Sequence, residues 1–222
     1  MNEPLAERIR PQFLEDYISQ QHLVGENGIL TNHIKQGIIP SLILWGPPGS
    51  GKTTLARLIA DKTDAAFVAF SAVTEGVARV RNVIKEAKER RKATNRSTIL
   101  FCDEIHRFNK AQQDAFLPHV ETGNIILIGA TTENPSFEVN AALLSRSRVF
   151  LLKPLKNSDI KSLLDRAISD QKKGLKKQFI SFEHEALSVI ASFANGDART
   201  ALNVLEFSEA SIPSGKNSSH VL

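Results

Sequence analysis

An eight-residue loop that follows a short apolar run constrains the fold of this chain more than any other feature. Residues 46–53 read Gly-Pro-Pro-Gly-Ser-Gly-Lys-Thr, which matches the pattern Gly-x-x-x-x-Gly-Lys-Ser/Thr. Glycines let backbone N–H groups approach phosphate oxygens, and the N-terminus of a following helix attracts the same anion. The pattern needs a strand before it and a helix after it, and segments 42–45 and 52–62 have the composition of both. The sequence therefore predicts a phosphate-binding loop rather than a glycine-rich turn.

The same loop predicts a role for each residue type in it. We expect Lys52 to reach the β- and γ-phosphates of a bound nucleotide and Thr53 to ligate Mg²⁺. The expected ligands are therefore ATP and Mg²⁺. The remaining nucleotide contacts are expected from Gly46, Pro47, Pro48, Gly49, Ser50, Gly51 and Thr54.

Apolar runs alternate with helically spaced segments as far as residue 152. The runs expected to form strands are 42–45, 66–70, 98–102, 125–128 and 148–152. The helical segments between them are 52–62, 77–93, 110–120 and 139–144. Strands that alternate with helices form right-handed crossovers and a parallel sheet, so the predicted fold class is α/β.

The strand pattern stops after residue 152, and three helical segments follow at 158–170, 183–194 and 198–210. Asn157 or Ser158, and Asp197, are the expected N-caps. We place a boundary near Pro154, where Lys-Pro interrupts the pattern. This gives an α/β nucleotide-binding domain at 1–154, a small helical domain at 155–211, and a polar tail or truncated linker at 212–222.

An acidic pair ends the strand predicted at 98–102. Asp103 stands where a direct or water-mediated Mg²⁺ ligand is needed, and Glu104 could polarise an attacking water. Acids commonly begin turns, but beside a phosphate loop the catalytic interpretation is favoured. Cys102, the only cysteine, is expected to be a small buried residue, and one cysteine excludes an intramolecular disulfide.

Each of three further polar sites has both a functional and a purely structural interpretation. Thr131-Thr132-Glu133-Asn134 follows an apolar run and could contact the γ-phosphate, position water, or only cap a loop. Arg146 and Arg199 could supply positive charge to a phosphate, or could be solvated like most surface arginines. The residues alone do not decide between these alternatives.

Charge and hydropathy limit the partners. The net charge is only +4, so nucleic acid would have to bind a local patch, for which 79–96 and 172–177 are candidates. Glutamates within 79–96 favour a solvated helix face there. No run approaches the ~20 apolar residues that cross a bilayer, and no signal peptide is visible, so a soluble intracellular protein is expected. The histidines, His106 among them, lack metal-ligand spacing.

The order of these motifs resembles that of AAA+ ATPases. More narrowly, four stretches resemble the Werner helicase-interacting protein family, which includes the fungal maintenance-of-genome-stability protein and bacterial replication-associated recombination protein A. The fungal member looks most similar. The resemblance covers nearly the whole chain to about residue 210 and rests on residues 5–11, 21–25, 43–49 and 129–137.

The resemblance implies a clamp-loader-like P-loop AAA+ module with three layers, in which a small helical lid follows a parallel five-stranded sheet. It implies that Lys52 and Thr53 are Walker A residues and that Asp103 and Glu104 are Walker B residues. Thr132 matches sensor 1, although many members of the wider superfamily carry Asn there, so Thr131 and Asn134 stay open.

The resemblance also assigns roles to residues outside the motifs that bind phosphate. Arg146 matches the arginine finger, which acts on the nucleotide of a neighbouring subunit, and Arg199 matches sensor 2 in the lid. Segment 5–24 would surround the adenine, with Arg8 and Val24 as the expected contacts.

The family implies a DNA-stimulated ATPase that maintains replication forks, as a homo-oligomer and with the replication machinery as partner. Its location would be the nucleus if the eukaryotic resemblance holds, and otherwise the cytoplasm. Neither the family's C-terminal tetramerisation domain nor the eukaryotic ubiquitin-binding zinc finger is visible, so an ATPase core is expected. The alternatives are a clamp-loader-type assembly subunit that uses ATP binding as a switch, and a branch-migration motor.

Overall fold

The computed structural model describes residues 3–175, 180–211 and 220–221. Its contacts divide the chain into two units. The first, called here the sheet unit, comprises residues 20–46 and 52–152. The second, called here the helical unit, comprises residues 1–19, 47–51 and 153–222. The domain boundary near Pro154 stays a prediction.

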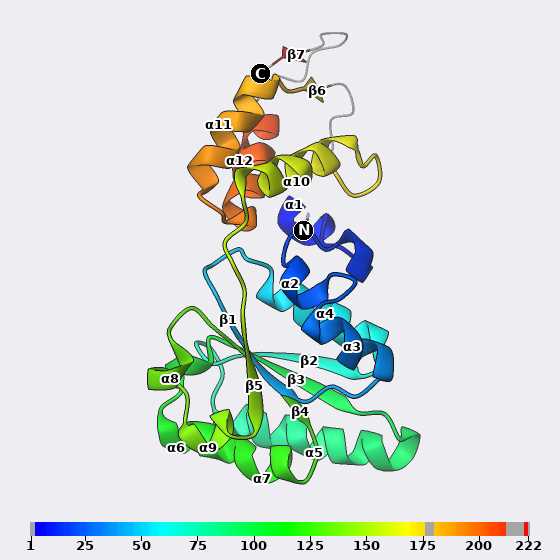
Figure 1. Ribbon diagram of the computed structural model, residues 1–222, viewed down its shortest axis with the longest axis vertical. Helices are drawn as coiled ribbons and strands as arrows, with labels where there is room; N and C mark the ends of the chain where they lie inside the picture. The colour runs from blue at the N-terminus through cyan, green and yellow to red at the C-terminus, as the bar shows by residue number, and fades with distance from the viewer. Residues whose placement is uncertain (1–2, 176–179, 212–219, 222) are drawn as a thin grey trace. The chain divides into compact units, whose positions relative to one another are not determined.

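A five-stranded parallel sheet forms the centre of the sheet unit, as predicted (Figure 1). The strand order is β2-β3-β4-β1-β5, so β4 lies between β3 and β1. Because all neighbouring strands run parallel, their carboxyl ends meet at one edge of the sheet. The strands are β1 (Ser41–Trp45), β2 (Ala66–Ser71), β3 (Thr98–Asp103), β4 (Ile126–Thr131) and β5 (Ser147–Leu151).

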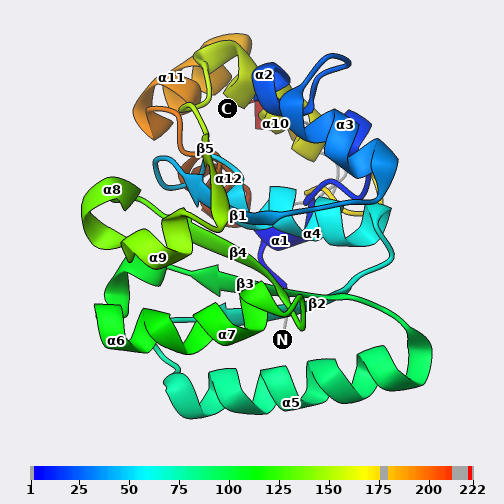
Figure 2. The same ribbon diagram turned by 60° about the horizontal axis from the view of Figure 1, so that its bottom comes forward.

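Helices cover both faces of this sheet, which is why its central strands are apolar on both sides. One face packs against α4 (Lys52–Lys62), and the opposite face packs against α5 (Val77–Thr94) and the helices that follow β3 (Figure 2). Ile43 of β1 belongs to the same buried apolar cluster as Val80, Val83 and Ile84 of α5. The unit also contains α2 (Gln21–Val24), α3 (Ile29–Gln36) and α8 (Pro135–Glu138).

Two helical segments of the sheet unit differ from prediction. Segment 110–120 is not one helix but α6 (Lys110–Gln113), the 3₁₀ turn η3 (Asp114–Phe116) and α7 (Leu117–Glu121). Pro118 has no N–H to continue the helical hydrogen bonds, which accounts for the break. Segment 139–144 is helical only as α9 (Ala141–Leu144), because the Asn140 side chain caps Ala142 N–H at 2.9 Å.

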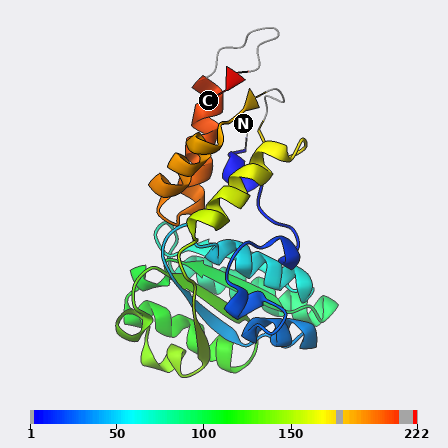
Figure 3. The same cartoon turned by 45° about the horizontal axis from the view of Figure 1, so that its top comes forward.

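Three helices and an N-terminal turn make up the core of the helical unit (Figure 3). Leu5 and Ile9, in and after α1 (Leu5–Arg8), are buried in this core. The backbone N–H of Leu5 donates to the Glu206 carboxylate at 3.0 Å, so α1 is tied to α12. The helices are α10 (Asn157–Ser169), α11 (His184–Ala194) and α12 (Ala198–Ser211), and a 3₁₀ turn η1 (Leu14–Asp16) follows α1.

One of the predicted N-caps is confirmed and the other is wrong. Asp197 Oδ1 accepts the backbone N–H groups of Arg199 at 2.8 Å and Thr200 at 3.1 Å. In contrast, α10 already begins at Asn157, and Lys156 is its N-cap. The Asp159 carboxylate accepts the Lys156 N–H at 2.9 Å, which fixes the start one residue earlier than predicted.

Strand pairing does not stop at residue 152, contrary to prediction. β6 (Ile180–Ser181) pairs in parallel with β7 (His220–Val221). A two-residue pair leaves no periodic pattern from which it could be predicted. The rest of the predicted tail, and Lys176 and Lys177, lie outside the described residues. Among the helices described, none has the length and apolar character to cross a bilayer.

Candidate nucleotide site

The two ends of the phosphate loop lie in the sheet unit. Gly46 follows β1, and its N–H donates to the Thr131 carbonyl at 3.1 Å. A Cβ at Gly46 would lie 2.4 Å from the Leu152 carbonyl oxygen, so the approach requires glycine. Lys52 begins α4 and is 8% exposed, and its Nζ donates to the Gly46 carbonyl at 2.7 Å. The ammonium group is thus folded back over the start of its own loop.

The tip of the loop, residues 47–51, belongs to the helical unit. Gly49 and Gly51 have positive φ angles of 66° and 96°. A Cβ would come within 1.8 Å of Asp197 Oδ1 at Gly49, and within 2.6 Å of the Tyr17 hydroxyl at Gly51. Both positions therefore exclude a side chain, as a loop that presents its backbone to phosphate requires.

Tyr17 supports this tip, and sequence reasoning gave it no individual role. Its hydroxyl donates to the Gly51 carbonyl at 3.1 Å. Burial raises the pKa of Tyr17, so the hydroxyl keeps its proton and remains a donor. Ser50 adds a bond inside the loop, from Oγ to the Pro47 carbonyl at 2.8 Å.

The other loop residues predicted to contact nucleotide are more accessible. Thr53 and Thr54 occupy the first turn of α4 and are partly exposed. Pro48 is exposed, and Pro47 is partly exposed. The first-turn position of Thr53 suits a hydroxyl ligand to a cation held beside phosphates.

The acidic pair lies at the carboxyl end of β3. Asp103 pairs with Ser71 of β2 and is partly exposed. Within the described ranges its carboxylate has no hydrogen-bond or ion-pair partner. Mg²⁺ is usually held by one or two carboxylates together with phosphates and water, so Asp103 and Thr53 are a suitable donor set. The described residues contain no cluster of three or more acidic, His or Cys side chains that could hold a metal ion by themselves.

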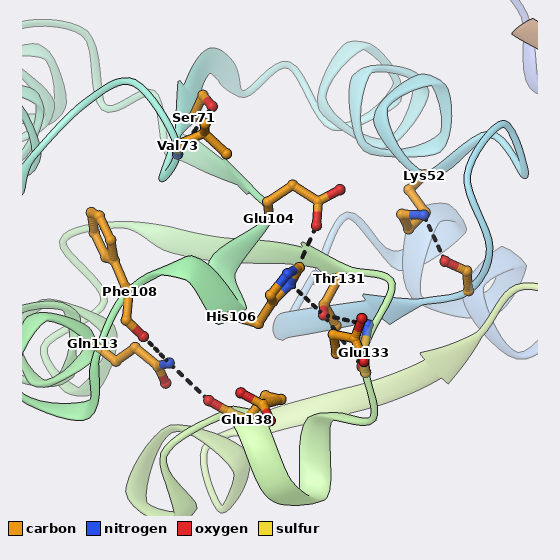
Figure 4. A network of polar contacts seen from close by, with 11 residues as sticks. Lys52, Ser71, Val73, Glu104, His106, Phe108, Gln113, Thr131, Glu133 and Glu138 are labelled. Atoms are coloured by element: carbon orange, nitrogen blue, oxygen red, sulfur yellow. Dashed lines mark hydrogen bonds and ion pairs between the residues drawn. The ribbon is translucent and has the colours of Figure 1, made fainter.

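Glu104 has an unusual backbone. Its φ of 52° and ψ of 47° are left-handed, a conformation that costs a residue with a Cβ about 1–2 kcal/mol. The Glu104 carbonyl accepts the Arg107 N–H at 2.8 Å and so starts the 3₁₀ turn η2 (Ile105–Arg107). This sharp turn, directly after the strand, brings His106 back towards Glu104 (Figure 4).

His106 connects the ends of β3 and β4. Its Nδ1 lies 3.2 Å from Glu104 Oε2 and 3.0 Å from Thr131 Oγ1. Its side chain is 11% exposed, against 31% for Glu104. Sequence reasoning considered His106 only as a metal ligand and missed this contact. Its position two residues after Glu104 was the available signal, but only a 3₁₀ turn makes that spacing a contact.

The three candidates after β4 differ in their surroundings. Thr131 is fully buried, and its Oγ1 accepts the Glu133 N–H at 3.0 Å and lies 3.2 Å from the Glu133 carbonyl. Asn134 caps α8 by accepting the Ser136 N–H at 3.0 Å. Thr132 is partly exposed, and within the described chain its hydroxyl has no hydrogen bond. Thr132 is therefore the one whose side chain is available to a ligand.

The two predicted phosphate arginines lie in different units. Arg146 follows α9, and its Nε lies 2.6 Å from Glu121 Oε1 of α7. Its Nη1 donates to the Ala142 carbonyl and to Ser145 Oγ, both at 2.9 Å. Arg199 is exposed in the first turn of α12. Neither guanidinium is buried, so both can reorient at low cost.

The two predicted adenine contacts are also in different units. Arg8 donates from Nη2 to the Gly174 carbonyl at 2.9 Å and from Nε to the Lys173 carbonyl at 3.2 Å. The Arg8 guanidinium therefore links α1 to the chain after α10. Val24 ends α2 in the sheet unit and is partly exposed.

The basic stretch on α5 is paired with its own surroundings. Arg79 contacts Glu75 at 3.4 Å, and Arg90 donates to Thr98 Oγ1 at 2.9 Å. Arg91 donates to the Gly123 carbonyl, and Arg96 pairs with Asp64 at 3.0 Å. These contacts favour the solvated helix face.

Cys102 is a free cysteine and is buried, as expected. Burial raises the pKa of its thiol, which disfavours the reactive thiolate.

Comparison with known proteins identifies a family and several relatives. The family model for AAA, the ATPase family associated with various cellular activities, matches residues 42–155. Replication-associated recombination protein A of Haemophilus influenzae is 55% identical over 203 residues, 91% of this chain and 45% of that protein. The Escherichia coli K12 protein of the same name is 54% identical, over 92% of this chain and 45% of that protein. ATPase WRNIP1 of Dictyostelium discoideum is 45% identical, over 91% of this chain and 23% of that protein.

Among solved structures, the chain resembles the Thermotoga maritima RuvB Holliday junction branch migration motor. The TM-score is 0.71 at 27% identity, over 89% of this chain and 64% of that one. The chain thus spans about 45% of the length of the bacterial relatives that it matches. Because these relatives are bacterial, the fungal resemblance is not supported, and the nuclear location expected from it gains no support.

Proposed function

Because the chain belongs to the AAA family of ATPases, we propose that it binds ATP with Mg²⁺ and hydrolyses it to ADP and phosphate. One observation carries the proposal. The phosphate loop after β1 and the acidic pair at the end of β3 are at the same edge of a parallel sheet, with β4 between them. Ligands of open α/β sheets bind outside the carboxyl ends of the strands.

Three residues would hold the triphosphate and its cation. The Lys52 ammonium, which donates to the Gly46 carbonyl in the described structure, would donate instead to β- and γ-phosphate oxygens. The Thr53 hydroxyl and the Asp103 carboxylate would hold Mg²⁺, directly or through water. When bound, Mg²⁺ supplies positive charge that offsets the phosphates.

Glu104 would act on water. Its carboxylate, 31% exposed at the end of β3, can accept a hydrogen bond from a water molecule and orient that water towards the γ-phosphorus. Thr132, whose hydroxyl has no hydrogen bond to any described residue, is the best placed of the candidates after β4 to contact the γ-phosphate. Thr131 and Asn134 have structural hydrogen bonds that would have to break first.

A second copy would complete the site. Arg146 is partly exposed and held by a surface ion pair of little strength, so it can turn to the nucleotide of a neighbouring subunit. Arg199 would contact phosphate within the same chain. An arginine finger contributes about 10³–10⁵ in rate in related phosphoryl-transfer proteins, so a lone copy should be slow.

DNA is the proposed effector. The support is 53–55% identity to several bacterial proteins named for replication-associated recombination. On this proposal, forked or single-stranded DNA stimulates turnover during fork maintenance.

A branch-migration motor is the second candidate, supported by the structural likeness to RuvB. Displacement of a strand from a four-way junction would favour that motor, and stimulation without displacement would favour fork maintenance.

The Glu104→Gln variant tests the proposed chemistry. Gln keeps the size of the side chain but is a poor proton acceptor, so phosphate release should fall by at least ~100-fold while the Kd for ATP stays within about twofold. Glu89→Gln, an exposed change on α5, is the matched control and should behave like the wild type. Wild-type turnover by the Glu104 variant would exclude its action on water.

A further inference from the structure

The contacts of His106 Nδ1 determine where its hydrogen is. An ionised Glu104 carboxylate can only accept hydrogen bonds, and its Oε2 lies 3.2 Å from Nδ1. An unprotonated Nδ1 would place two lone pairs against each other. Nδ1 must therefore carry a hydrogen and donate to Glu104 Oε2.

Thr131 shares this hydrogen. Its Oγ1 accepts the Glu133 N–H at 3.0 Å and can donate its own hydrogen to the Glu133 carbonyl at 3.2 Å. The remaining contact of Oγ1 is His106 Nδ1 at 3.0 Å, which must then act as donor. One Nδ1–H thus points at two acceptors, one after β3 and one at the end of β4 (Figure 4).

We propose that His106 is a positioning residue of the ATPase site, whose Nδ1–H orients the Glu104 carboxylate and links it to Thr131 at the end of β4. This inference rests on the proposed function of Glu104. The bond to His106 uses Oε2 and leaves Oε1 to accept a hydrogen bond from water. Thr131 directly precedes Thr132. A ligand that contacts Thr132 and moves the end of β4 would therefore change how the His106 Nδ1–H is divided between its two acceptors, Thr131 and Glu104.

The left-handed backbone of Glu104 makes such a partner necessary. The direction of the Glu104 side chain is set by the backbone of this one strained residue. The 3₁₀ turn that follows then brings His106 back beside the Glu104 carboxylate. With 31% of its side chain exposed, the Glu104 carboxylate would otherwise sample several rotamers. The His106 side chain is 11% exposed and its Nδ1 also contacts Thr131, so it is itself held in place and restricts this sampling.

Two amide substitutions separate positioning from packing. In His106→Asn the amide nitrogen takes the place of Nδ1, whereas in His106→Gln it lies one bond farther out. Partners that orient metal-ligating side chains typically contribute 10- to 100-fold in activity, and we expect the same range for a partner that orients Glu104. We expect His106→Gln and His106→Ala to lower kcat by that factor with an unchanged Kd for ATP, and His106→Asn to recover most of it. Equal loss in all three, or loss of ATP binding, would contradict a positioning role.

A measurement that needs no turnover tests the same point. Long-range ¹H–¹⁵N NMR spectra report which ring nitrogen of a histidine is protonated, and the His106 signals are identified by their loss in His106→Asn. We expect a protonated Nδ1, and a shift of its ¹⁵N resonance in Thr131→Val. A neutral ring with hydrogen on Nε2 alone, or an unchanged resonance in Thr131→Val, would overturn the inference. Protonated Nδ1 in a chain that binds no ATP would keep the hydrogen bond from His106 to Glu104 but reject the proposed function, and with it a role of His106 in ATP hydrolysis.

Discussion

Glu104 has a backbone conformation that residues other than glycine seldom adopt. A loop with no constraint on its side chain would place glycine there, because glycine adopts positive φ without the cost of a Cβ. A carboxylate at this position is therefore expected to serve the site rather than stability. Strain of this kind is often found where a side chain must be held in one direction.

The strain can be measured by comparing two small replacements. Glu104→Gly should give a free energy of unfolding about 1 kcal/mol higher than Glu104→Ala, since only the alanine keeps a strained Cβ. On exposed Glu89 in the middle of α5 the order should reverse, because alanine favours helix over glycine by about 1 kcal/mol. Chemical denaturation measures both differences. The same order at both positions would argue against strain at Glu104.

Trp45 gives a signal for nucleotide binding. It is the only tryptophan, it ends β1, and Gly46 follows it. Its partly exposed indole should change emission when nucleotide orders the loop, so saturating ATP should shift the spectrum of the wild type. Lys52→Ala, which removes the ammonium, should need far more ATP for the same change. An unchanged wild-type spectrum alongside calorimetric binding would show that loop and strand are not coupled.

At the scale of elements, α12 depends on its N-cap. Asp197 accepts two backbone N–H groups of the first turn. Asp197→Ala should lower the free energy of unfolding of the helical unit by about 0.5–2 kcal/mol, whereas Asp197→Asn keeps an acceptor and should lower it by less. Thermal unfolding followed by circular dichroism compares the two. Equal losses would mean that the carboxylate charge, not the cap, stabilises the helix.

The sequence predicted the five strands and the two long helices of the sheet unit, α4 and α5, because their periodicity is strong. All five strands and α4 were found within a few residues of their observed bounds, since buried parallel strands are short apolar runs. The break at Pro118 was missed, although proline cannot donate the hydrogen bond that a continuous helix requires there. The pairing of β6 with β7 could not be predicted, since it joins two residues to two others about 40 positions away.

The site was likewise predictable where it depends on local sequence patterns and not where it depends on tertiary contacts. Motifs with fixed spacing placed the residues after β1 and β3, because the sheet itself brings those ends to one edge. The contact of Tyr17 with the phosphate loop depends on tertiary packing, and the contact of His106 with Glu104 depends on one 3₁₀ turn. No spacing rule for helices or strands would bring His106 to Glu104 and Thr131 together.

At the scale of the whole molecule, hydrolysis at a shared site requires that copies cooperate. Arg146→Ala and Glu104→Gln should each be nearly inactive, the first for lack of the finger and the second for lack of the group that orients water. A mixture of the two should regain phosphate release, because a Glu104→Gln copy can offer its Arg146 to the intact site of its neighbour. Two inactive variants that stay inactive when mixed would place Arg146 outside the shared site.

Hydrolysis at a site shared between copies is tested most directly by phosphate release per subunit, measured against protein concentration with and without forked DNA. The rate should climb with concentration and climb further with the fork, and an Arg146→Ala variant should show neither rise. A rate that stays flat over the same range, while Trp45 emission reports bound ATP, would contradict hydrolysis at a site shared between copies.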